Sequence, residues 1–240
     1  NYYIAPSYNF DLGDKDDLSV IASYQRREYV RHQGIPYSGG NYKKYSHSLF
    51  FGDPDYGYDV DVYRLGSNYA HYFDNAWTFK QNFAVTKTET LGDSILASGR
   101  SVLPTIKRAI NNQDKQDVNY TLDNNLQRNF NFGLINYDVM VGVDMMRERS
   151  DYYRRTDTIN DFDVNNPSYG NISIKKVGVP TEEITYSQYA GLYLRNTIKI
   201  DDDWIIGLSG RHDWTQVEID NILTNTTTKI QIMLLRVVHR

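Results

Sequence analysis

Residues 186–217 read YSQYAGLYLRNTIKI, then DDD, then WIIGLSGRHDWTQV. In the first of these segments, apolar side chains occupy alternate positions at Ala190, Leu192, Leu194, Ile198 and Ile200. The second segment repeats the scheme, and a period of two is typical of a β-strand. Each segment exceeds the usual strand of about 5 to 6 residues and reaches the 9 to 11 or so that a tilted strand needs to cross a bilayer. The stretch therefore predicts a β-hairpin of membrane-spanning length, with its turn at 201–203.

The same unit recurs along the rest of the chain. Alternating segments predict further strands at residues 2–8, 18–27, 60–73, 77–88, 115–130 and 136–153. The longest uninterrupted alternation has five consecutive apolar positions on one face: Tyr137, Val139, Val141, Val143 and Met145. The chain is thus expected to be all-β and antiparallel, built from repeated hairpins.

The connections between the predicted strands alternate between short and long. Long segments are expected at 28–59, 89–114 and 154–183; a helical turn within 101–110 is limited to its first positions by Pro104. Short turns at one rim and long loops at the other are typical of outer-membrane barrels, whereas a soluble sandwich has no reason to separate them. The pattern predicts an antiparallel transmembrane β-barrel portion with short periplasmic turns and long extracellular loops.

Composition narrows the possible functions. A net charge of −4 over 240 residues supplies no basic stripe for nucleic acid. Twenty-one tyrosines suit strands and membrane interfaces, and the lack of cysteine excludes disulfides and thiol chemistry. No apolar run approaches the 18 or so residues of a transmembrane helix. The mean hydropathy of −0.60 is low, but transmembrane barrels have low averages because their strands alternate.

The two ends of the sequence depart from the repeating unit. Residues 230–240 read IQIMLLRVVHR and lose the alternation. We therefore divide the chain into a partial barrel, residues 1–229, and an aberrant or truncated tail, residues 230–240, which is the ragged end of a ninth strand or, less favoured, a short basic amphipathic helix. The chain begins at Asn1 without a signal peptide, which suggests a fragment.

Several stretches resemble the barrel of TonB-dependent siderophore receptors, especially the ferric-hydroxamate (ferrichrome-type) branch. They are YYIAP at 2–6, LSVIASYQ at 18–25, FGDPD at 51–55, FDNAWTFKQN at 73–82, VGVD at 141–144 and GRHD at 210–213. Arg195 and Asn196 depart from the Gln and Asp that are commoner in such receptors. The resemblance implies a 22-stranded barrel with a plugged lumen, of which this chain would hold about 8 to 9 strands as an open or partly curled sheet.

The resemblance also implies a location in the bacterial outer membrane and a function in TonB-dependent uptake of a ferric siderophore. Without the plug, the segment that recruits TonB and the last strands, this chain alone should not transport. Candidate ligand contacts are the loop residues Tyr29, His32, Tyr37, Tyr42, Tyr45 and Tyr56, although such side chains also pack on neighbouring loops or lie at the headgroup level. Arg195 and Arg211 are expected to face the lumen, with Asp213 as a salt-bridge partner.

Two other functions stay open at this point: a receptor for haem or cobalamin, and a soluble all-β carbohydrate-binding or adhesion module. No nucleophile elbow, P-loop or dinucleotide fingerprint occurs, so no catalytic residue and no enzyme activity is expected. The acids at 53, 55, 59 and 61 lack a calcium-loop pattern, and the five histidines show no zinc-ligand spacing. We expect no metal site and no cofactor; the transported ligand would be the iron(III)–siderophore complex itself, and outer-membrane lipid would surround the strands.

Overall fold

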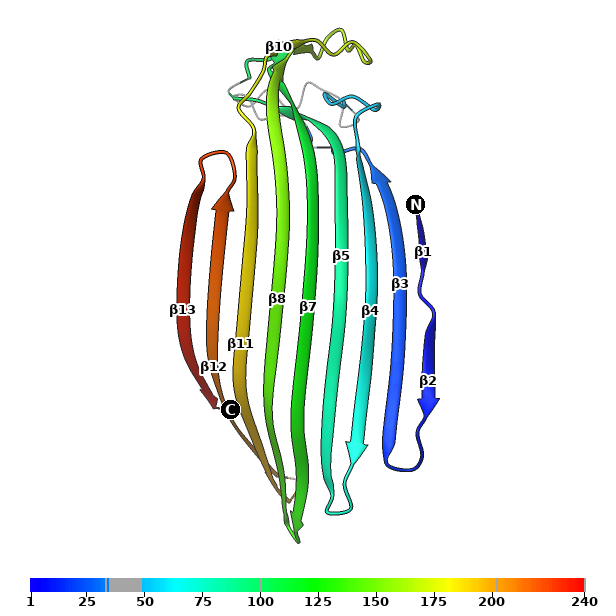
Figure 1. Cartoon of the computed structure of the whole chain (residues 1–240), viewed down its shortest axis with the longest axis vertical. Helices are drawn as coiled ribbons and strands as arrows, with labels where there is room; N and C mark the ends of the chain where they lie inside the picture. The colour runs from blue at the N-terminus through cyan, green and yellow to red at the C-terminus, as the bar shows by residue number, and fades with distance from the viewer. Residues whose placement is uncertain (33, 35–48, 100, 202, 240) are drawn as a thin grey trace.

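The computed structural model describes residues 1–32, 34, 49–99, 101–201 and 203–239. They form one open, curved antiparallel sheet in the order β1-β3-β4-β5-β7-β8-β11-β12-β13, with β2 beside β1 on the same edge of β3 (Figure 1). The long strands are β3 Asp16–Tyr29, β4 Tyr58–Tyr72, β5 Trp77–Ala97, β7 Arg108–Phe132, β8 Ile135–Ile159, β11 Thr181–Ile200, β12 Trp204–Asn221 and β13 Thr226–His239. The short strands are β1 Tyr2–Ile4, β2 Ser7–Asp11, β6 Thr105–Ile106, β9 Phe162–Asp163 and β10 Ile174–Lys176.

Each long strand pairs with the next long strand along the chain, as the repeated hairpins predict. In the hairpin of β11 and β12, pairing runs without a break from Ile200 opposite Trp204 to Glu183 opposite Asn221. The turns of the hairpins β4–β5, β7–β8 and β11–β12 lie at one end of the sheet, where Ala76, Gly133 and Asp201 have positive φ angles. The turn between β12 and β13, at the other end, is also short and has a positive φ angle at Asn225 (Figure 1). The predicted all-β, antiparallel architecture is confirmed, and no helix among the described residues is long and apolar enough to cross a membrane.

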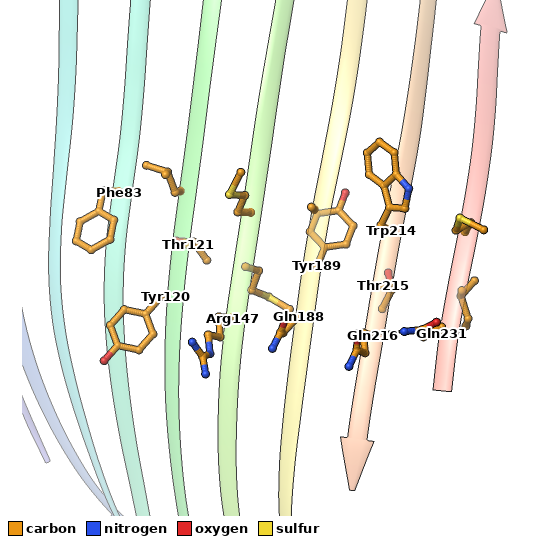
Figure 2. A pocket seen from close by; sticks show the side chains of 16 residues that line it. Phe83, Tyr120, Thr121, Arg147, Gln188, Tyr189, Trp214, Thr215, Gln216 and Gln231 are labelled. Atoms are coloured by element: carbon orange, nitrogen blue, oxygen red, sulfur yellow. Dashed lines mark hydrogen bonds between the residues drawn. The ribbon is translucent and has the colours of Figure 1, made fainter. Parts of the chain in front are cut away.

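The register separates the side chains into two faces. Residues directly opposite each other share a face, and one face carries a continuous apolar row across six strands: Phe83, Leu122, Met145, Ala190, Trp214 and Met233. Two residues further along each strand, the same face carries a polar row: Tyr120, Arg147, Gln188, Gln216 and Gln231 (Figure 2). One step beyond lies a charged row that includes Lys87, Arg149, Glu218 and Lys229. This succession is the one expected where a lipid-facing surface meets the headgroups and then water.

The strands are longer than the alternation indicated. The segment 89–114 was expected to be a long loop, but β5 continues to Ala97 and β7 starts at Arg108. The helical turn expected within 101–110 is also wrong, because this segment contains β6. The reason is that both strands extend beyond the apolar band. Polar and charged residues such as Glu89, Asp93, Asp114 and Gln116 interrupt the apolar period there, while the backbone ladder continues.

The tail 230–239 continues β13 in register with β12. The alternation is lost because both faces of this part of β13 carry apolar side chains. Ile230, Ile232 and Leu234 lie on the face of the sheet that carries Thr215 and Asp213 on β12. All three of these apolar side chains are exposed. The division of the chain at residue 229 stays a prediction.

We predict that Val141→Arg destabilises the assembled barrel by about 2 to 4 kcal/mol, because Val141 lies opposite Leu126 and Leu194 on the apolar face, midway along the band. Gln127→Arg is the matched control, since Gln127 is adjacent to Leu126 and lies on the other face. The measurement is the free energy of unfolding in bilayers. Equal losses in the two variants would contradict the assignment of faces.

Candidate ligand-binding cap and lumen wall

A folded cap lies at the end of the sheet where the strands extend furthest. Its core consists of Phe51, Ile106, Phe162 and Val164, with Leu49, Ala97 and Leu103 packed around it. The pairing of β6 with β9 joins the connection after β5 to the connection after β8. Three segments that are distant in the sequence therefore form one packed unit, seen at the top of Figure 1.

A buried arginine holds the cap to the sheet. Arg108 is 1% exposed, and its Nε donates to the carbonyl oxygen of Asn160 at 3.1 Å while its Nη1 donates to that of Phe51 at 3.2 Å. The guanidinium carbon lies 5.2 Å from the ring centre of Phe162. Burial lowers the pKa of Arg108, and the nearby Asp53 carboxylate opposes that shift. One side chain on β7 thus fixes two of the three connections.

The Asp53 carboxylate joins the same connections through backbone amides. It is 1% exposed and accepts hydrogen bonds from the amides of Asp55, at 3.1 Å, and Gly170, at 2.6 Å. Below the cap, a chain of hydrogen bonds crosses four strands: Tyr58 to Ser94 at 2.7 Å, Asn111 to Tyr58 at 3.1 Å and Thr156 to Asn111 at 3.0 Å. The cap is therefore anchored by polar contacts as well as by its apolar core.

His32, one of the predicted ligand residues, packs against the cap. Its ring stacks on Phe50 with centres 5.3 Å apart, and its Nδ1 accepts a hydrogen bond from the amide of Gly34 at 3.0 Å. Phe50 also faces Tyr169, whose hydroxyl donates to the carbonyl oxygen of Phe50 at 2.7 Å. Tyr169 was not predicted, because it belongs to a different connection and only the folded cap brings it to this aromatic group.

The other predicted tyrosines fall into two groups. Tyr29 ends β3 and packs against Tyr58, with ring centres 5.6 Å apart. Tyr56 is half-buried, and among the described residues its side chain has no ring or hydrogen-bond partner. Tyr37, Tyr42 and Tyr45 lie outside the described residues. A ligand contact by any of the six stays a prediction.

The concave face of the sheet carries the predicted lumen residues. Arg211 donates through Nη2 to both oxygens of Asp144, at 2.8 and 2.9 Å, and through Nε to Asp213 at 2.6 Å. The hydroxyls of Tyr189 and Tyr193 donate to Asp213 and Asp123 at 2.6 and 2.8 Å. Asp123 and Asp144 were missed, because they lie on β7 and β8 and meet Tyr193 and Arg211 only through the register of the strands.

Arg195 lies on the same face, nearer the tight turns. It borders a hollow of about 440 Å³ together with Lys199 and Asp138. Within the described residues, no group of three or more metal-ligating side chains comes together.

Two glycines leave room for the hydrogen-bonded side chains around Arg211 on the lumen side, which we call the lumen network. A Cβ on Gly142 would overlap the ring of Tyr193, and a Cβ on Gly191 would overlap Nη2 of Arg211 and lie 2.5 Å from Asp144 Oδ1. The large polar side chains therefore lie flat across the neighbouring strands, over positions that have no side chain. Such covering of strand glycines by aromatic rings is a recurrent way to fix register.

Together these features define a class of protein: a segment of a membrane-spanning β-barrel with a lipid-facing side, a polar lumen side and a folded cap over the long connections. Residues 4–232 match the family model described as "TonB dependent receptor-like, beta-barrel". The chain belongs to this family, whose barrels lie in the outer membrane.

Curated relatives support the same assignment. The chain is 29% identical over 231 residues to the ferrioxamine B receptor of Salmonella typhimurium (strain SL1344), covering 92% of this chain and 32% of that protein. It is 25% identical over 240 residues to the ferrioxamine receptor of Yersinia enterocolitica, covering 94% and 33%. The ferrichrome outer membrane transporter/phage receptor of Escherichia coli (strain K12) is 23% identical, with 95% and 34% covered. The chain thus spans about a third of the length of these relatives.

Solved structures share the fold. The siderophore receptor PiuA from Acinetobacter baumannii superposes with a TM-score of 0.82 at 14% identity, over 99% of this chain and 38% of that one. The ferric citrate transporter FecA gives a TM-score of 0.73 at 15% identity, over 97% and 32%. The open sheet therefore has the fold of part of these larger chains.

Replacement of Gly191 by alanine should break the Arg211–Asp144 pair and destabilise the barrel by about 1 to 3 kcal/mol, because the new methyl group has no space. Gly210→Ala is the control, since a Cβ there meets no atom within 4 Å. Unfolding in urea in the presence of lipid measures both. Equal stability of the two variants would exclude a packing role for Gly191.

Arg108→Leu should loosen the cap, because it leaves two buried carbonyls unpaired at a cost of about 1 to 3 kcal/mol each. Amide hydrogen exchange of residues 49–57 and 160–170, measured in the full-length receptor, should become faster. Lys107→Leu, at the adjacent exposed position, should leave that exchange unchanged. Unchanged protection in Arg108→Leu would show that the apolar core alone holds the cap.

Proposed function

We propose that this chain forms part of the barrel wall and extracellular cap of an outer-membrane receptor that takes up a ferric siderophore with energy supplied through TonB. The observation that carries the proposal is the match of more than nine tenths of the chain to relatives named as ferrioxamine and ferrichrome receptors. The proposed role is transport, with no chemical conversion of the ligand and no resident cofactor.

The cap offers suitable chemistry for the first binding step. A siderophore complex presents oxygen atoms and apolar linkers, which suit aromatic rings with polar edges. His32, Phe50 and Tyr169 form an aromatic group in the cap, and Arg108 and Asp53 fix the backbone beneath it. A rigid platform of this kind lowers the entropy cost of holding a ligand.

The soluble binding-module alternative has less support. Among the described residues the long strands form a single layer, and the apolar face is open: Leu192 is 46% exposed and Leu194 45%. A soluble sandwich would cover such a face with a second sheet. Haem and cobalamin remain alternatives that only the ligand test separates.

The transported ligand can be tested by growth. A strain that makes no siderophore and lacks its own receptors is given the full-length receptor that contains this sequence. Growth should occur with ferrioxamine B or ferrichrome as iron source and should require TonB. Growth on haem but on neither siderophore would reject the proposal.

A contact by Tyr56 is the sharpest prediction for the cap, because its ring and hydroxyl are free of partners within the described residues. Tyr56→Ala in the full-length receptor should raise the Kd for the siderophore about tenfold, which corresponds to about 1.4 kcal/mol. Tyr72→Ala, at the rim with the tight turns, should leave the Kd unchanged. Equilibrium binding measured by fluorescence quenching compares them, and an unaltered Kd in Tyr56→Ala would exclude the contact.

A further inference from the structure

Two primary amides lie within the apolar, lipid-facing band, where no part of the proposed transport uses them. Gln81 on β5 and Asn124 on β7 are directly opposite each other in the register. One step toward the cap, the same face carries Phe83. One step the other way, it carries Leu126, which is opposite Val141 on β8. Apolar side chains therefore flank the amide pair in both directions along the strands.

The amide pair uses only part of its hydrogen-bonding capacity. Gln81 Nε2 donates to Asn124 Oδ1 at 2.8 Å. Within the described part of the chain, the Gln81 Oε1 and the Asn124 Nδ2 form no hydrogen bond. One oxygen and three N–H groups are thus left without a partner. Since hydrocarbon supplies no water to these groups, leaving them unpaired in the bilayer is unfavourable.

The other polar side chains of the same row make contacts elsewhere. Tyr69 on β4 lies opposite Gln81, but its hydroxyl donates to Asp16 at 2.6 Å. His212 is on β12, separated from β5 by β7, β8 and β11 (Figure 1), and its ring packs edge-on against Trp214 with ring centres 4.3 Å apart. Neither Tyr69 nor His212 hydrogen-bonds to the amide pair, so the described part of the sheet leaves that pair open.

The surface around the amide pair suits close packing against another protein surface. Leu65 on β4 and Phe83 on β5 are 52% and 37% exposed on this face. Ser67, which lies opposite Phe83, is small and adds a neutral hydroxyl. Small polar residues of this kind are enriched where membrane-spanning segments touch. None of these side chains is charged, so two such surfaces do not repel each other.

We propose that Ser67, Gln81 and Asn124, which we call the amide patch, form the centre of a contact between two copies of the receptor in the membrane. A primary amide carries both donors and an acceptor, so it is complementary to a second primary amide. A two-fold axis through the patch would place Asn124 of one copy against Gln81 of the other, and the reverse. The inference does not depend on which ligand the receptor transports.

Cysteine crosslinking of the full-length receptor in lipid vesicles tests this contact. The 240 residues contain no cysteine, so Phe83→Cys places a single thiol of this region beside the patch and leaves the amides intact. Oxidation with copper phenanthroline should give a disulfide-linked dimer. Leu208→Cys is the matched control, because Leu208 is also exposed on the lipid-facing side but lies on β12. Equal yields at the two positions, a greater yield at Leu208→Cys or no dimer at either would overturn the proposal.

A second set of variants tests the amides themselves. In the Phe83→Cys receptor, Gln81→Leu combined with Asn124→Leu should lower the dimerisation constant about tenfold, because two symmetric hydrogen bonds worth about threefold each are lost. Crosslinking yields over a range of protein-to-lipid ratios measure this constant. Asn82→Leu is the control, since it removes an exposed amide from the adjacent residue on the lumen side. An unchanged constant in the double variant, or an equal loss in Asn82→Leu, would show that the amide patch does not hold the two copies together.

Discussion

The structure depends on one constraint: inside a bilayer, every backbone N–H and C=O group must find its partner within the protein. The long strands satisfy it through unbroken ladders, of which β7 with β8 is the longest, from Phe132 opposite Ile135 to Ala109 opposite Thr158. Because the ladder fixes the register, it also fixes which side chains meet lipid and which meet the lumen. Lipid-facing and lumen-facing side chains therefore alternate along each strand, and strand pairing leaves the backbone little conformational freedom.

Beyond the bilayer the same ladders continue for a different reason. Water can satisfy the backbone there, so strand pairing is no longer obligatory, yet β5, β7 and β8 remain paired up to the cap. The buried contacts of Arg108 and the hydrogen-bond chain from Tyr58 to Thr156 lie at this level. They offset the cost of ordering long exposed strands and hold the three connections as one unit. The cap is thus an extension of the barrel wall.

Sequence reasoning succeeded where apolar alternation carried the signal. It located the hairpins, assigned Val141 and Leu194 to one face, and placed Arg211 beside Asp213. It failed where polar residues interrupt the apolar alternation, so the end of β5 and the start of β7 were predicted to be loop. It also failed for Asp123, Asp144, Arg108 and Tyr169, whose partners lie on other strands or connections. Contacts of this kind depend on register, which a single sequence does not contain.

Register links all of these features. A slip of one residue between β11 and its neighbours would turn Leu192 toward the lumen and move Gly191 away from Arg211 and Asp144. In β12 the same slip would turn Arg211 toward lipid, which costs about 2 to 4 kcal/mol near the midplane. A one-residue slip is therefore disfavoured on both faces of the sheet: the lumen face loses the contacts of Arg211, and the lipid face loses apolar side chains. A membrane barrel without a dense core can in this way still exclude a one-residue slip of its strands, because such a slip exposes a charge to lipid and buries nothing in exchange.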